Sequence, residues 1–208
     1  MITSHIQLGG NYEYSNKITM SRIFLAIIIL IVLLFPWHQV DIDMPVYVVN
    51  GNINMDLKYI IAGVLFIVAS LTDFVDGKVA RKYNMVTDFG KMIDAISDKI
   101  LTNTLIVVLA CDNMVHPVIA VIIIARDIIV DSIKMLVGNK GKAVAAIGVA
   151  KYKTASLMVG LTLKLFYDLP FSLFINGVSD FLLIVAAILS IISGVKYYQM
   201  AREYITEM

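Results

Sequence analysis

Six long apolar stretches, separated by short polar segments, dominate the chain. They span roughly residues 17–37, 56–77, 88–112, 116–137, 145–168 and 173–200. A helix needs about 20 apolar residues to cross the hydrocarbon core of a bilayer. The pattern therefore predicts an all-α integral membrane protein with six transmembrane helices. Residues 1–15 are mixed and polar, as in an interfacial helix or a cloning remnant, and residues 16–208 are expected to form one membrane domain.

Connections rich in Lys and Arg alternate along the chain with connections that have few basic residues. Loops rich in Lys and Arg remain cytoplasmic. The basic residues lie at the two chain termini and at every second connection between the apolar stretches. They are Lys17, Arg22, Lys78, Arg81, Lys82, Lys91, Lys140, Lys142, Lys151, Lys153, Lys196 and Arg202. The other connections, around 41–56, 111–117 and 168–171, have only Lys58 and Lys164 nearby. Both termini are therefore expected in the cytoplasm, with three outer and two inner loops.

Composition supports a membrane protein and argues against a nucleic-acid partner. Hydrophobic residues make up 59% of the chain, well above a soluble domain. The formal net charge is only +1, so no overall field favours nucleic acid. The single cysteine, Cys111, has no partner for an intramolecular disulfide and no neighbouring His or Cys at metal-ligand spacing.

Four aspartates stand at regular spacings around the second polar connection. Asp73 and Asp76 are three residues apart, and Asp94 and Asp98 are four apart. In helical segments each pair projects from one helix face. An ionised group at membrane depth costs about 2.5–3.5 kcal/mol on insertion scales, and neighbouring like charges repel. Four converging carboxylates therefore need a cation, whereas any one of them alone could be a solvated helix cap.

A carboxylate cluster without His or Cys selects Mg²⁺ or Mn²⁺, and two such ions could hold a diphosphate during phosphoryl transfer. Gly77 and Gly90 lack side chains, so another backbone or a nucleotide can approach closely. Arg81 lies one turn beyond Asp76 and is placed to pair with a phosphate or an aspartate. The stretch therefore predicts a metal-assisted site for a diphosphate.

The whole pattern, Asp73-x2-Asp76-Gly77-x2-Ala80-Arg81-x8-Gly90-x3-Asp94-x3-Asp98, resembles the motif of the CDP-alcohol phosphotransferases, with every fixed position filled. The resemblance implies a six-helix membrane fold, usually a homodimer, whose site opens to the cytoplasm. It further implies that the four aspartates hold two metal ions and that Asp98 is also the general base. By the same resemblance CDP binds to Asp73, Gly77, Ala80, Arg81 and Gly90.

Three other segments bear on the acceptor alcohol. Asn16-Lys-Ile-Thr19-Met-Ser-Arg22 resembles the opening segment of bacterial phosphatidylglycerophosphate synthases, with Ser15 where proline is usual. Ala125-Arg126-Asp127 with Lys134 resembles their Ala-Arg-Glu segment and later Arg, and Ala150-Lys151-Tyr-Lys153-Thr154 resembles their Gly-Lys-x-Lys-Thr. The departures are Asp127, Lys134 and Ala150, and Lys does not replace Arg at a bidentate phosphate site.

The same cations suit glycerol 3-phosphate, whose phosphate carries about two negative charges. Arg126 lies inside an apolar stretch, where an ionisable residue is a functional candidate. The alternatives for Arg126 are a structural pair with Asp127 or a salt bridge to another helix. For Lys151 and Lys153 the alternative is a purely topological role. We expect Arg126, Lys134, Lys151 and Lys153 to bind the acceptor phosphate, with possible support from Asn16, Thr19 and Arg22.

The expected activity is transfer of the phosphatidyl group from CDP-diacylglycerol to glycerol 3-phosphate, in a bacterial cytoplasmic membrane and among its lipids. Within the family, serine, inositol phosphate or a phosphatidyl lipid are the rival acceptors. Outside enzymes, the rival is a cation transporter whose intramembrane carboxylates bind the transported ion. Transporters of that kind usually carry internal repeats or broken midplane helices, and neither is clear in this sequence.

Overall fold

The computed structural model describes the backbone of residues 20–41, 44–49, 53–82, 88–139, 147–175 and 177–206. Within those ranges it leaves out the side chains of residues 38, 53, 73–82, 88–95, 139 and 203–206. The predicted segment 1–15, with Asn16 and Thr19, lies outside the described residues. The chain divides into two compact units, Met1–Leu105 and Ile106–Met208.

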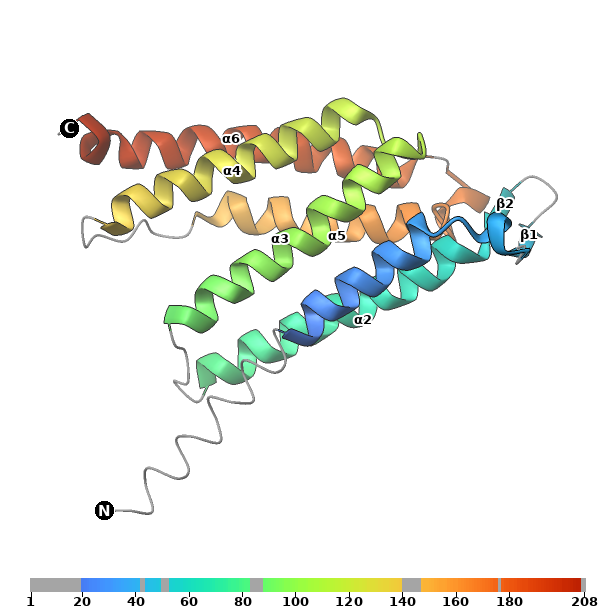
Figure 1. Cartoon of the computed structure of the whole chain (residues 1–208). Coiled ribbons are helices and arrows are strands. Elements are labelled where there is room, and N and C mark those ends of the chain that lie inside the picture. The colour runs from blue at the N-terminus through green and yellow to red at the C-terminus, as the bar shows by residue number, and fades with distance from the viewer. Residues whose placement is uncertain are drawn as a thin grey trace, which may run out of the picture. The chain divides into compact units, whose positions relative to one another are not determined.

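In the first unit the described elements are a helix at Met20–Leu34, the 3-10 turn η1 (Trp37–Val40), strands β1 (Val46–Val49) and β2 (Ile53–Asp56), and helix α2 (Leu57–Lys82) (Figure 1). Helix α3 (Asp88–Cys111) begins in this unit and ends in the second. Buried side chains follow a helical repeat in both long helices. They are Arg22, Ala26, Ile29 and Leu33 in the first helix and Tyr59, Ala62, Phe66 and Ala69 in α2.

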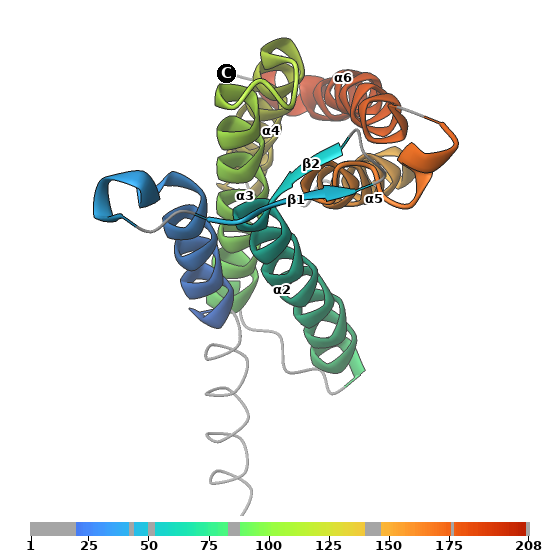
Figure 2. The same cartoon turned by 90° about the vertical axis from the view of Figure 1, so that its right-hand side faces the viewer.

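A short antiparallel hairpin joins the first helix to α2 and was not predicted from the sequence. Its register pairs Val46 with Asp56 and Val49 with Ile53, and β2 leads directly into α2 (Figure 2). The hairpin carries Asp56, whose carboxylate accepts the Lys58 backbone N–H at 3.1 Å in the first turn of α2. The connection therefore supplies a hydrogen-bond acceptor at the N-terminal end of the helix.

The second unit contains the end of α3, then α4 (Pro117–Asn139), α5 (Gly148–Leu165), the turn η2 (Phe171–Leu173) and α6 (Val178–Thr206). Helix α6 packs along both α4 and α5 (Figures 1 and 2). Between α5 and α6, Gly160 allows close approach, because a Cβ there would lie 3.0 Å from Leu183 Cδ2. Leu161, Leu165 and Leu183 are fully buried in the same unit.

The turn between α5 and α6 is held by two carboxylates. Asp168 accepts the backbone N–H of Ser179 at 2.8 Å, which satisfies one of the unpaired N–H groups at the start of α6. Asp180 pairs with Lys164 at 2.6 Å. These contacts join the end of α5 to the first turn of α6.

The helices correspond to the predicted apolar stretches, with their ends shifted by up to six residues, as at the C-terminal end of α6. Within the described residues one helix, Val178–Arg202, is both long and apolar enough to cross a membrane by composition and length, and Met20–Leu34 and Leu57–Thr72 are shorter apolar helices. Large apolar side chains remain exposed on the outer faces, among them Phe181, Ile184 and Ile188 of α6. The described part is thus mostly helical with one candidate membrane span, and the hairpin of β1 and β2 departs from the all-α prediction. The six spans and their orientation remain predictions.

Candidate functional site

The aspartate motif lies on helical backbone, as its spacing required. Asp73 and Asp76 fall within α2, and Asp94 and Asp98 fall within α3. Gly77, Ala80 and Arg81 belong to the last turns of α2, and Gly90 to the first turn of α3. The side chains of all these residues except Asp98 lie outside the described part. The structure therefore confirms the local helical spacing and leaves the metal and CDP roles as predictions.

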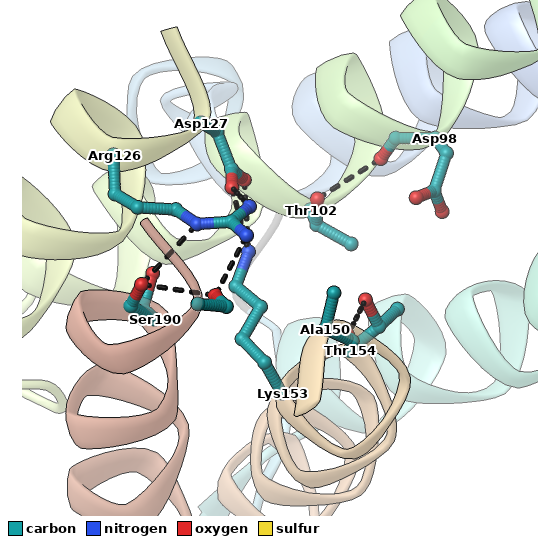
Figure 3. A network of polar contacts seen from close by, with 9 residues as sticks. Asp98, Thr102, Arg126, Asp127, Ala150, Lys153, Thr154 and Ser190 are labelled. Atoms are coloured by element: carbon teal, nitrogen blue, oxygen red, sulfur yellow. Dashed lines mark hydrogen bonds and ion pairs between the residues drawn. The ribbon is translucent and has the colours of Figure 1, made fainter. Parts of the chain in front are cut away.

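Asp98 is half-buried in a polar section of α3. Its neighbour Ser97 is fully buried, and the Thr102 hydroxyl donates to the Asp98 backbone oxygen at 2.9 Å (Figure 3). Among the described side chains no group of three His, Cys, Asp or Glu residues could hold a metal ion. Three of the four motif aspartates are outside that search, so the donor set is judged by its chemistry: four carboxylates suit a hard divalent cation.

The second unit holds a buried network of charges centred on Asp127. Arg126 Nη1 donates to Asp127 Oδ1 at 2.9 Å, and Lys153 Nζ lies 2.9 Å from both carboxylate oxygens (Figure 3). Asp127 is 5% exposed and Lys153 is 4% exposed. The three side chains together carry one net positive charge. The arrangement therefore places two cationic side chains against one buried carboxylate.

The buried position of Asp127 follows from the helical repeat of α4. Its buried residues are Ala120, Ile123, Asp127, Val130, Ile133 and Val137. Asp127 thus occupies a core position on the face that packs on α6, where a lone charge would be strongly disfavoured. Two cations from α4 and α5 compensate it.

Two further cations were predicted for the acceptor phosphate. Lys134 Nζ lies 4.9 Å from the centroid of the Tyr197 ring, and Arg126 Cζ lies 5.6 Å from the same centroid, both within cation–π range. Lys151 is exposed and has no part in this network of described side chains. In the first unit Arg22 is 2% exposed, one of its largest buried side chains. The structure thus brings Arg126, Lys153 and Lys134 together around Asp127 and Tyr197.

Helix α6 contributes contacts that the sequence analysis did not include. Arg126 donates from Nε to the Ser190 carbonyl at 3.2 Å and from Nη2 to the Ser193 hydroxyl at 2.6 Å. The signal was present as Ser190, Ser193, Gly194 and Tyr197, whose i, i+3, i+4, i+7 spacing places small and polar residues on one face of an apolar helix. Arg126 and Asp127 do form the pair that was left open as an alternative, and Lys153 completes it.

Known proteins resemble this chain along most of its length. A sequence model of the CDP-alcohol phosphatidyltransferase family matches residues 12–193. A Bacillus subtilis CDP-diacylglycerol–glycerol-3-phosphate 3-phosphatidyltransferase is 32% identical over 90% of this chain and 94% of its own length. Enzymes of the same name from Rickettsia bellii and Mycoplasma genitalium are 34% and 30% identical, over 77% and 74% of this chain and 89% and 65% of their own lengths.

Proposed function

Because the chain belongs to the CDP-alcohol phosphatidyltransferase family, as the aspartate motif predicted, we propose that it transfers the phosphatidyl group of CDP-diacylglycerol to glycerol 3-phosphate. The products are phosphatidylglycerophosphate and CMP. The observation that carries the proposal is the similarity to relatives named for this reaction, which extends over nine tenths of the chain in the Bacillus subtilis enzyme. The activity belongs to phospholipid synthesis.

The proposed reaction is a direct displacement at phosphorus. A hydroxyl oxygen of glycerol 3-phosphate forms a bond to the phosphorus that carries diacylglycerol, and the bond from that phosphorus to the oxygen shared with CMP breaks. CMP leaves with the electron pair of that bond. Asp98 accepts the proton of the attacking hydroxyl, a role supported by its position in the motif and its half-buried place on α3.

The metal proposal rests on the donor set. Asp73 and Asp76 on α2, with Asp94 and Asp98 on α3, offer only hard carboxylate oxygens, which fit Mg²⁺ or Mn²⁺. Two such ions, when bound, supply positive charge that neutralises the diphosphate. Arg81 adds a fixed cation for phosphate oxygens, and Gly77, Ala80 and Gly90 leave room for the CDP moiety.

The acceptor phosphate binds, in this proposal, to the cations of the second unit. Arg126 and Lys153 carry two positive charges against the single negative charge of Asp127. Lys134 lies on the same Tyr197 ring as Arg126, and Lys151 is an exposed cation two residues before Lys153. Their surplus charge suits a phosphate of about two negative charges better than uncharged serine.

The protein is proposed to cross a bacterial cytoplasmic membrane six times as a homodimer, with both termini and the catalytic residues on the cytoplasmic side. Helices α2, α3, α4 and α6 have 26, 24, 23 and 29 residues, and about 20 are needed to span the hydrocarbon core. The alternating distribution of Lys and Arg supports the orientation. The homodimer rests on family resemblance.

An acceptor assay tests the proposal. Purified protein in detergent is incubated with CDP-diacylglycerol, Mg²⁺ or Mn²⁺, and glycerol 3-phosphate, serine or inositol phosphate as sole acceptor, and CMP is measured. We expect CMP release only with glycerol 3-phosphate and its loss in Asp98→Asn. Release of CMP with another acceptor would agree with phosphatidyl transfer but refute glycerol 3-phosphate as the acceptor. No release with any acceptor would refute the reaction.

A further inference from the structure

The polar face of α6 surrounds Arg126 although α6 is otherwise strongly apolar. Ser190 and Ser193 are fully buried and Tyr197 is 2% exposed. Each contacts the Arg126 side chain, through the Ser190 carbonyl, the Ser193 hydroxyl and the Tyr197 ring. Of the two serine side chains, the Ser193 hydroxyl bonds to Arg126, whereas Ser190 contributes its backbone carbonyl.

The contacts fix the plane of the guanidinium group. Nε donates to the Ser190 carbonyl at 3.2 Å, Nη2 to the Ser193 hydroxyl at 2.6 Å, and Nη1 to Asp127 at 2.9 Å. The Ser193 hydroxyl in turn donates to the same Ser190 carbonyl at 3.0 Å. These bonds use three of the five N–H groups of a guanidinium. One N–H on each terminal nitrogen is left without a partner among the described side chains.

Two of the three groups that accept hydrogen bonds from Arg126 are neutral. They can orient the guanidinium, but they do not compensate its charge. The Ser190 carbonyl and Ser193 hydroxyl hold Arg126 in place without cancelling its charge. The Asp127 carboxylate is shared with Lys153, so it does not neutralise both cations.

Gly194 allows the arginine stem to lie against α6. A Cβ at this position would lie 3.2 Å from Arg126 Cγ, closer than ordinary van der Waals contact. A side chain at position 194 would therefore require the Arg126 stem to shift by a few tenths of an ångström, which changes the position of the guanidinium relative to Ser193.

We propose that Ser193 and Gly194 are positioning residues, which hold Arg126 in the orientation that receives the phosphate of the acceptor substrate. The inference rests on the proposed function and deepens it, because it adds α6 to the residues that determine acceptor affinity. Ser193 acts through its hydroxyl and Gly194 through the absence of a side chain.

The test compares two serines of α6. Ser193→Ala removes the hydroxyl that binds Arg126, whereas Ser179→Ala removes an equally buried hydroxyl that has no hydrogen-bond partner among the described residues. With the purified full chain, we expect Ser193→Ala to raise KM for glycerol 3-phosphate about fivefold, the size expected for partial loss of one charged hydrogen bond, and to leave KM for CDP-diacylglycerol unchanged. Ser179→Ala should change neither constant.

Gly194→Ala provides a second variant that retains every hydrogen-bonding group, and we expect the same selective rise in KM. If Ser193→Ala behaves like Ser179→Ala, or if both substrates' KM values rise equally, the positioning role is refuted. Should Ser193→Ala not fold, Gly194→Ala decides alone, and an unchanged KM for the acceptor refutes the role.

Failure of the proposed function is separately visible in the unaltered protein. If that protein uses another phosphorylated acceptor, the acceptor assignment fails while the same comparison with the new acceptor still decides the roles of Ser193 and Gly194. An acceptor without a phosphate would refute both proposals.

Discussion

At the scale of single residues, Asp127 is a buried carboxylate that contacts two cations. Its carboxylate is buried in the helix α4 face that packs on α6 and is stabilised by Arg126 and Lys153. Removing one member of a buried ion-pair network leaves the others without compensation, which is usually more costly than the network is stabilising. Asp127 therefore matters for folding as well as for the charge of the network.

Asp127→Asn retains the shape of the side chain and removes its charge. We expect the free energy of unfolding to fall by about 3 kcal/mol, because Lys153 and Arg126 then lose the buried carboxylate that both of them contact. The measurement is the thermal midpoint of the protein in detergent. Asp127→Glu retains the charge and serves as the matched control, so equal losses in both variants would contradict an electrostatic origin.

Sequence reasoning reached part of this network. Arg126 was recognisable because a charged residue inside an apolar stretch is unusual, and its pairing with the adjacent Asp127 was one of two open alternatives. The link from Asp127 to Lys153 spans 26 residues and depends on how α4 and α5 pack, which local spacing does not determine. The Ser193 contact spans 67 residues and was missed for the same reason.

At the scale of elements, the α5–α6 pair depends on a close approach at Gly160. Leu183 lies against this glycine, and Leu182 Cβ is 3.4 Å from where a Cβ would stand. Gly138, near the end of α4, has open space around it, with nothing within 4 Å of such a Cβ. The same substitution can therefore be compared at a packed position, Gly160, and at an open one, Gly138.

Gly160→Val should lower the free energy of unfolding by about 1–3 kcal/mol, because the branched side chain cannot enter a fully packed contact without shifting α6. Gly138→Val should change it by about 0.5 kcal/mol or less, as expected for an exposed substitution. Thermal midpoints in the same detergent compare the two. A loss of stability at Gly138 as large as that at Gly160 would show that helix propensity, rather than packing, dominates.

The helices themselves were predictable from the apolar stretches, whose ends agree with the structure within six residues. The hairpin of β1 and β2 was not predicted, although Asn50-Gly51 between two apolar runs is a hairpin signal in the sequence. Its strands are only four residues each, and β2 contains Asn54 and Asp56, which are uncommon in strands. The strand β2 continues directly into α2 and contacts it, and such a contact produces no periodic pattern of apolar residues.

At the scale of the whole molecule, the predicted orientation in the membrane rests on the distribution of positive charges, and labelling of a single cysteine can test it. Cys111, the only cysteine in the sequence, is exposed at the C-terminal end of α3. The predicted topology places this end on the outer side. Gly148, at the start of α5, lies at an end predicted to face the cytoplasm and has open space around it.

A membrane-impermeant maleimide should therefore label Cys111 in intact cells. In a Cys111→Ser background, Gly148→Cys should be labelled only after the membrane is permeabilised. The two variants control for each other, since each carries one thiol at one end of a helix. Labelling of Gly148→Cys, but not of Cys111, in intact cells would reverse the orientation, and labelling of both would refute the alternating spans.

The central claim is transfer of a phosphatidyl group to glycerol 3-phosphate, and the most direct measurement follows the acceptor into the product. Protein in detergent is incubated with CDP-diacylglycerol, a divalent cation and glycerol 3-phosphate labelled on its phosphate. We expect label to enter the lipid phase in equal amount to the CMP released, and both to be lost in Asp98→Asn. CMP release with the label left in water would indicate hydrolysis and would contradict the account.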